Sequence, residues 1–324
     1  MNRRDWIEAG SLATLGALAA PYAQAFSRPE AKLNCLFKLS VITDEISQDL
    51  GHALEVAAKE FSLGFVELRG LWNKNIVNLD AKEVAEAQSL LKKYDLQVTD
   101  IASPLFKVDW PGAPKSKYSP TGDAYNASFS FEQQDEVLER AANMAHAFGT
   151  NRIRLFDFWR LEDDKPFRKD MDEKLREISA KAAKQSMILV LENEYECNTA
   201  TGPESARTLA AVPNKNFFLN WDPGNAARIG DKAFPEGYAL LPKDRIGHMH
   251  LKDVKRNADG TYDWECMGRG IIDYAGQFRA MMRDGYRGSM SLETHWEGGG
   301  SKEQSSRQSM AGTKELLRKA GALQ

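Results

Sequence analysis

The chain has 324 residues, of which 42% are hydrophobic, 10% aromatic and 27% charged, so a disordered chain, a collagen-like repeat and a coiled-coil rod are excluded. The 43 Lys and Arg residues against 46 Asp and Glu residues give a net charge of −3, and the lack of a basic surplus argues against a nucleic-acid binder. The 3 cysteines are scattered without C-x-x-C spacing, so neither a disulfide framework nor a zinc ribbon is indicated.

The first 25 residues have the pattern of an export signal. Arg3 and Arg4 precede a weakly apolar run at 9–20, and the tripeptide at 23–25 offers small residues at both positions that a signal peptidase reads. Twin arginines before a modest apolar stretch are typical of a Tat signal, which predicts an exported, periplasmic protein. The apolar run is shorter than the roughly 20 residues that span a bilayer, so no stable membrane anchor is expected.

Short β-type runs alternate with amphipathic helical patterns along the rest of the chain. Eight strands are predicted, at 39–46, 65–70, 96–103, 151–159, 187–194, 217–225, 246–254 and 289–296. Helical patterns follow them, at 52–62, 81–95, 131–149, 172–186, 204–212, 236–241, 274–285 and 305–321. This order predicts an α/β protein with a parallel sheet closed as a (β/α)8 TIM barrel, a single domain at 38–324 after an N-terminal extension at 26–37.

A doubly wound open sheet is the structural alternative, but the segment after the first predicted strand lacks the glycine-rich nucleotide loop of that fold. Two connections are long, Pro104–Ser130 and Lys255–Ile272. Both leave the C-terminal ends of predicted strands, which is the face where barrel enzymes carry their sites. We therefore expect binding loops there, with simple disorder as the other interpretation.

Four consecutive predicted strands end in groups that can hold a divalent cation. These groups are Glu192 and Glu194, then Asp222 and Asn225, then His248, His250 and Lys252, and finally Glu293 and His295. Side chains alternate along a strand, so His248, His250 and Lys252 share one face. Because a buried cluster of negative charge is costly without compensation, a cation is expected among these side chains.

The order of these groups resembles the xylose isomerase-like TIM-barrel superfamily of sugar isomerases and epimerases. The resemblance covers residues 38–320 and also rests on the segments TDEIS at 43–47, VELRG at 66–70 and ASPLFK at 102–107. In that family one metal ion is held by Glu, Asp, His and Glu from four consecutive strands, which implies Glu192, Asp222, His250 and Glu293 here. Three carboxylates and one imidazole favour one divalent ion, Mn²⁺ first, with Mg²⁺, Co²⁺ and Zn²⁺ as alternatives.

The ketohexose 3-epimerase branch of the family implies substrate contacts that this chain matches only in part. Arg256, six residues after the metal-binding His, is a match, whereas Asn225 and Asn198 stand where that branch has an imidazole and a carboxylate. The predicted substrate-binding residues are Arg256, Asn225, His248, Lys252 and Glu67. Simpler structural roles stay open for some residues: Lys252 paired with Asp253, His248 bonded to a metal-binding carboxylate, and Glu192 paired with Arg154.

The predicted function is a metal-dependent sugar isomerase or epimerase that acts on a keto-sugar or keto-glycoside through an enediolate. Glu192 and Glu293 are the predicted catalytic pair, one removing the proton and the other returning it. A lyase or dehydratase resembling inosose dehydratase is the alternative, since elimination needs the same base and metal. Endonuclease IV-like DNA repair is disfavoured by only 5 histidines and net acidity, and a non-enzymatic sugar-binding barrel by the full metal set. The expected partner is a small carbohydrate, and a homo-oligomer stays open.

Overall fold

The computed structural model describes residues 32–120 and 127–324, so the predicted signal at 1–25 lies outside the described residues. Eight parallel strands form one sheet. They are β1 (Lys38–Val41), β2 (Phe65–Leu68), β5 (Gln97–Leu105), β6 (Arg152–Leu155), β7 (Ile188–Glu192), β8 (Phe217–Trp221), β9 (Ile246–Leu251) and β12 (Ser289–Leu292). Each overlaps one of the eight strands that the sequence predicts.

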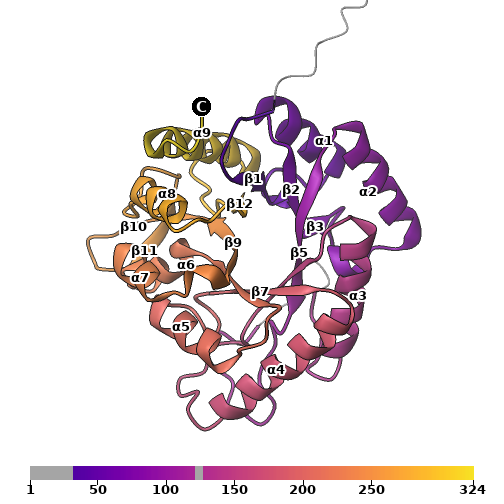
Figure 1. Cartoon of the computed structure of the whole chain (residues 1–324), viewed down its shortest axis with the longest axis vertical. Helices are drawn as coiled ribbons and strands as arrows, with labels where there is room; N and C mark the ends of the chain where they lie inside the picture. The colour runs from indigo at the N-terminus through magenta and orange to yellow at the C-terminus, as the bar shows by residue number, and fades with distance from the viewer. Residues whose placement is uncertain (1–31, 121–126) are drawn as a thin grey trace, which may run out of the picture. The chain divides into compact units, whose positions relative to one another are not determined.

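The sheet closes on itself into a barrel (Figure 1). Its hydrogen-bonded order runs β1-β12-β9-β8-β7-β6-β5-β2, and a parallel bridge between Ile42 and Glu67 joins the two edges. In the register of the parallel ladders, Ser291 of β12 lies between Ser40 of β1 and His250 of β9. The closed order confirms the predicted (β/α)8 barrel and excludes the doubly wound open sheet.

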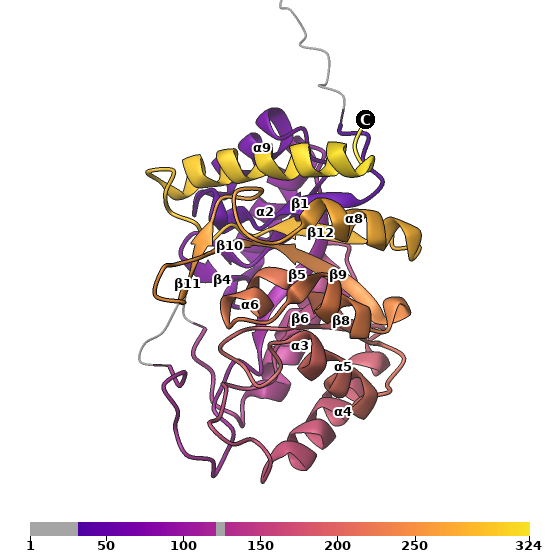
Figure 2. The same ribbon diagram turned by 90° about the vertical axis from the view of Figure 1, so that its left-hand side faces the viewer.

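Helices surround the barrel (Figures 1 and 2). They are α1 (Leu50–Glu55), α2 (Ala81–Lys93), α3 (Gln134–Ala147), α4 (Arg168–Lys184), α5 (Gly202–Ala211), α6 (Pro223–Arg228), α7 (Tyr238–Leu240), α8 (Tyr274–Arg283) and α9 (Lys302–Ala320). In α3 the buried residues recur at three- and four-residue spacing and pack against β5: Val137, Leu138, Ala141, Ala142 and Ala145. Among the described helices, none is long and apolar enough to cross a membrane.

Several predicted strands run past their observed ends because polar residues leave the ladder there. The first strand stops at Val41, since Thr43–Glu45 forms a 3-10 turn. The sixth strand stops at Trp221, although the sequence pattern predicts that it continues to residue 225. Asp222 is instead the N-cap of α6. The Asp222 side chain accepts the backbone N–H of Asn225 at 2.9 Å. An Asp N-cap followed by Pro223 at the first helical position is a helix-start pattern, so the sequence did carry this signal.

The connection at Lys255–Ile272 contains more structure than a plain loop. Its start belongs to a hairpin in which β10 (Asp253–Arg256) pairs antiparallel with β11 (Tyr262–Glu265). A shorter hairpin, β3 (Gly70–Leu71) with β4 (Lys74–Asn75), follows β2. These hairpins and the connection after β5 add walls at the C-terminal ends of the strands, where the candidate site lies.

Candidate metal and substrate site

A cavity of about 770 Å³ lies at the C-terminal ends of the barrel strands. Its lining combines acidic, basic and aromatic side chains, among them Glu45, Arg69, Lys107, Arg154, Glu194, Trp264, Glu293, His295 and Trp296. A concave, polar site at this face is where barrel enzymes bind their substrates.

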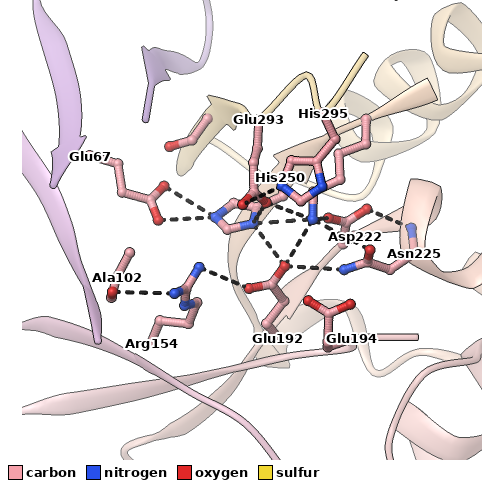
Figure 3. Close-up of polar contacts among 12 residues, drawn as sticks. Glu67, Ala102, Arg154, Glu192, Glu194, Asp222, Asn225, His250, Glu293 and His295 are labelled. Atoms are coloured by element: carbon pink, nitrogen blue, oxygen red, sulfur yellow. Dashed lines mark hydrogen bonds and ion pairs between the residues drawn. The ribbon is translucent and has the colours of Figure 1, made fainter. Parts of the chain in front are cut away.

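The four residues predicted as metal ligands meet beside this cavity (Figure 3). One side-chain oxygen or nitrogen atom from each of Glu192, Asp222, His250 and Glu293 lies within 4.8 Å of the others. Glu192 ends β7, His250 lies in β9, and Asp222 and Glu293 directly follow β8 and β12. All four side chains are buried. They form a candidate site for a metal ion.

Local hydrogen bonds fix the two strand ends that carry Glu192 and Asp222. The Asn193 side chain donates to the backbone carbonyl of Asp222 at 2.8 Å and accepts the backbone N–H of Asp222 at 2.7 Å. Asp222 uses Oδ1 to cap α6, so its Oδ2 is left to face the other site residues. The helix cap and the Asn193 bridge therefore aim this carboxylate before any ligand binds.

His250 is oriented by Glu67 from β2. Both carboxylate oxygens of Glu67 lie 3.1 Å from His250 Nε2, and both side chains are fully buried. When Nε2 donates its proton to Glu67, Nδ1 is the ring atom that faces Glu293 Oε2 at 3.0 Å and Glu192 Oε1 at 3.2 Å. A carboxylate that fixes the tautomer of an imidazole in this way is usual in metal sites.

The ammonium group of Lys252 lies among the same carboxylates. Its Nζ is 2.6 Å from Glu293 Oε2, 2.8 Å from Asp222 Oδ2 and 3.2 Å from Glu192 Oε1. Burial opposes its charge, but the three carboxylates outweigh burial and raise the pKa of Lys252 well above its usual value. Asp253 accepts backbone N–H groups of the following loop, so the alternative of a Lys252–Asp253 ion pair is wrong.

Three buried carboxylate oxygens retain the capacity to bind a cation. Glu192 Oε2, Asp222 Oδ2 and Glu293 Oε2 accept no hydrogen bond of normal geometry from the described residues, although each has a basic nitrogen within ion-pair distance. Together with His250 Nδ1 they offer the hard donors that a divalent ion prefers. Such an ion would compete with the Lys252 ammonium for the same oxygens. The residues present therefore fit a divalent metal.

Burial and charge act against each other on the acidic residues of this site. Burial alone would raise the pKa of Glu192, but Lys252 and His250 outweigh it and hold the pKa well below its usual range. The pKa of Glu293 is lowered in the same way, with Lys252 the largest opposing charge. Asp222 differs, because burial prevails there and raises its pKa. Glu192 and Glu293 are therefore ionised near neutral pH, as proton acceptors must be.

His248 and Glu67, predicted as substrate contacts, lie outside the cavity lining and are fully buried. His248 Nε2 is 3.1 Å from Glu67 Oε2, and its Nδ1 is 2.7 Å from Ser289 Oγ. Both side chains point into the barrel interior because β2 and β9 turn them toward each other. In this structure the pair supports His250, and its predicted contact with substrate stays a prediction.

Asn225 and Arg256 are the remaining predicted substrate contacts, and Asn198 stands where the epimerase branch has a carboxylate. Asn225 lies in the site, where its Nδ2 donates to Glu192 Oε1 at 3.1 Å. Arg256 ends β10 with an exposed side chain and lies outside the cavity lining, so the hairpin geometry gives its predicted contact no support. Asn198 donates to the backbone carbonyl of Asp157 at 2.9 Å and stabilises a loop after β6.

Sequence reasoning assigned no site role to Glu45 and Lys107, and it considered Arg154 only as an ion-pair partner. That ion pair exists, with Arg154 Nη1 3.1 Å from Glu192 Oε2. Arg69 contacts both Glu45 and Glu293, so it ties the turn after β1 to the end of β12. Glu45 and Arg69 belong to the TDEIS and VELRG segments, which were the available signal for them.

The sequence profile of the xylose isomerase-like TIM barrel matches residues 56–317, which include all four candidate ligands. The chain belongs to the xylose isomerase-like TIM barrel family. A curated relative, SgbU of Escherichia coli (strain K12), whose name proposes an L-ribulose-5-phosphate 3-epimerase, is 27% identical to this chain over 169 residues. That match covers 50% of this chain and 58% of SgbU, so the chain spans less than two thirds of this relative.

Two solved structures share the fold of this barrel. A xylose isomerase-like TIM barrel protein from Mycobacterium smegmatis, in complex with magnesium, has a TM-score of 0.62 and 17% identity over 85% of this chain and 89% of that one. The 3-keto-D-glucoside 4-epimerase YcjR from E. coli has a TM-score of 0.63 and 16% identity over 87% of this chain and 99% of that one.

Replacing Lys252 by Met tests the charge balance of the site. The change leaves Glu192, Asp222 and Glu293 without their shared cation, so the metal-free variant should lose about 3–5 kcal/mol in free energy of unfolding at neutral pH. Carboxylates deprived of a cation have raised pKa values in the folded state, so part of the loss should be recovered on lowering the pH to about 5. Urea unfolding in the presence of a chelator measures both effects.

The matched control is Lys255→Met, which removes an exposed ammonium group 3.8 Å from Glu265 on the β10–β11 hairpin. That variant should stay within about 0.5 kcal/mol of the unsubstituted protein. Equal losses in the two Met variants would contradict the charge balance described here.

Proposed function

We propose that the protein is a metal-dependent isomerase or epimerase that moves a proton next to the ketone of a neutral sugar or glycoside. The observation that carries the proposal is the pair of buried carboxylates, Glu192 and Glu293, which both belong to the candidate metal site and come from strands separated by β8 and β9. Removing a proton next to a ketone produces an enediolate, whose negative oxygens need nearby positive charge. The names of SgbU and YcjR, both epimerases, support this reaction class.

The metal in this proposal is one divalent ion held by Glu192, Asp222, His250 and Glu293. When bound, it supplies positive charge that stabilises the negative oxygens of the substrate. Three carboxylates and one imidazole favour Mn²⁺ or Mg²⁺, with Co²⁺ and Zn²⁺ as alternatives. The magnesium complex of the M. smegmatis barrel supports a divalent ion in this fold.

The side chains of the protein carry the proton. One of Glu192 and Glu293 removes it from the carbon, and the other returns it, to the opposite face in an epimerisation. Asn225 Nδ2 and Lys252 Nζ both contact Glu192 Oε1, at 3.1 and 3.2 Å, which orients that carboxylate. His295 Nε2 lies 3.1 Å from Glu293 Oε1 and does the same from the cavity side.

The charge pattern of the cavity favours a neutral substrate. Its deeper basic groups are already paired with acids, such as Arg154 with Glu192 at 3.1 Å and Lys107 with Glu194 at 3.5 Å. A phosphate group, which carries about −1.5 to −2 charges at neutral pH, would have to break these pairs. We therefore propose an unphosphorylated keto-sugar, in contrast to the sugar phosphate in the name of SgbU.

Deuterium incorporation tests the proposed chemistry. Metal-loaded protein incubated with a panel of keto-sugars in deuterated water should place deuterium next to the carbonyl, as read by mass spectrometry and NMR. Glu192→Gln and Glu293→Gln should each slow this exchange by about 10²–10⁴-fold, because an amide cannot accept the proton. Glu315→Gln on the exposed face of α9, outside the cavity lining, is the matched control and should retain the rate.

The same panel tests the substrate and the outcome of the reaction. Free fructose, tagatose and psicose should be poor substrates, because Asn225 and Asn198 cannot replace a charged imidazole and a carboxylate. Efficient interconversion of fructose and psicose would contradict this expectation. An unsaturated product with loss of a substituent would favour the lyase over the epimerase, with the same metal and base.

Metal binding has its own test. His250→Ala should sharply reduce the Mn²⁺ content of the purified protein while its circular dichroism spectrum is retained. Glu67→Gln should weaken Mn²⁺ affinity by about 10–100-fold, since it removes the acceptor that orients His250. Glu83→Gln in the first turn of α2 is the control, and metal content by mass spectrometry is the measurement. Full occupancy in the His250→Ala variant would show that the ligand assignment is wrong.

Export to the periplasm is a further part of the proposal and rests on the sequence of residues 1–25. If the twin arginines direct a Tat route, replacing Arg3 and Arg4 by Lys should leave precursor in the cytoplasm, as measured by cell fractionation and immunoblotting. Normal export of the double Lys variant would reject the Tat route.

A further inference from the structure

A second cavity adjoins the candidate active site. It has a volume of about 580 Å³ and shares three lining residues with the first cavity: Pro104, Lys107 and Ala127. Its other walls combine the apolar side chains of Val108, Pro120, Phe129, Phe131 and Trp159 with the polar ones of Asp109, Ser128, Ser130 and Glu196. The proposed proton transfer uses none of these side chains, so the proposed reaction assigns no role to this cavity.

Backbone hydrogen bonds join two of the segments that line this cavity. The segments that follow β5 and β6 continue side by side beyond the strands, with Phe158 N–H donating to Phe106 at 3.1 Å and Trp159 N–H donating to Val108 at 3.0 Å. Phe131 packs on this pair of segments, with its ring centroid 6.1 Å from that of Phe158. A preformed wall spares a ligand the entropy cost of ordering it.

Lys107 lies at the border between the two cavities. Its Nζ is 3.5 Å from Glu194 Oε2, which lines the first cavity, and 5.1 Å from the ring centroid of Trp159, which lines the second. The border therefore carries a hydrogen-bond donor between a cavity with many charged side chains in its lining and a cavity with several aromatic ones. A glycosidic oxygen, which joins a polar sugar to an apolar substituent, could accept a hydrogen bond from Lys107 at this border.

We propose that the second cavity is a subsite for an apolar, ring-sized substituent on the substrate sugar, such as the aryl aglycone of a keto-glycoside. The assignment rests on the proposed function, because it places the sugar ring in the first cavity. A sugar hydroxyl group placed against Val108, Phe129 or Phe131 would lose water there without gaining an equivalent hydrogen bond. An aromatic ring gains free energy on leaving water for the same walls.

Binding of unreactive glycosides tests the subsite. Methyl and phenyl β-D-glucoside lack the ketone, so their affinities for the metal-loaded protein can be measured by calorimetry without turnover. The phenyl glucoside should bind at least about tenfold more tightly than the methyl glucoside, because its ring buries apolar area that the methyl group cannot. Equal affinities, or no detectable binding of the phenyl glucoside at millimolar concentration, would overturn the subsite.

Shortening one side chain of the cavity lining tests whether the preference for the phenyl glucoside arises there. Phe129→Ala should bring the ratio of the two affinities toward one while leaving the methyl glucoside unaffected. Phe218→Ala is the matched control, since Phe218 is also half-buried but lines a separate cavity near the start of β8. An unchanged ratio in Phe129→Ala together with a lowered ratio in Phe218→Ala would place the aglycone elsewhere and reject the assignment.

The outcomes separate this subsite from the proposed reaction. Deuterium exchange into a simple ketose without any aglycone preference would keep the reaction and reject the subsite. A clear preference for the phenyl glucoside in a protein that exchanges no deuterium with any keto-sugar would keep the subsite and reject the reaction.

Discussion

Charge compensation inside the barrel is the constraint on which the candidate site depends. Acidic side chains from several strands are buried next to one another, and imidazole, ammonium and guanidinium groups balance them. Burying an ion without a partner costs several kcal/mol, so this balance must be kept whenever one group moves or reacts. A divalent ion and the Lys252 ammonium can each supply positive charge to these carboxylates, so the same oxygens can bind either of them.

The fold meets this constraint by ending its strands in polar residues. β7 is buried along almost its whole length and delivers Glu192 at its last position. β8 stops one residue before Asp222, whose carboxylate then serves two purposes, with one oxygen capping α6 and the other facing the site. Since the backbone fixes both strand ends, the ligand geometry is a property of the barrel itself and requires no rearrangement of a loop.

The strand pattern was enough to predict the barrel and the convergence of its polar strand ends, because consecutive parallel strands bring their C-terminal ends together. The selection of Glu192, Asp222, His250 and Glu293 among those residues came from the resemblance to the family. The resemblance was insufficient for Arg256, since the β10–β11 hairpin brings Asp263 and Trp264 of β11 to the cavity lining and leaves the Arg256 side chain exposed outside it. The supporting roles of Glu67 and His248 depend on partners far away in the sequence, which no local pattern reveals. Helix α6 was predictable from its Asp-Pro start, but the apolar run before it favoured a strand.

The barrel closes where Ile42, just after β1, forms a backbone bridge with Glu67 of β2, and we call this junction the seam. Glu67 joins the edges of the sheet through its backbone bridge to Ile42, and its side chain at the same time holds His250 from β9. Glu293 follows β12, the last of the eight barrel strands in chain order and the one that pairs with β1. A partly synthesised chain therefore lacks a complete set of ligands, and an opened seam pulls the imidazole away from its support. The four candidate ligands therefore come together only in molecules in which β12 has paired with β1.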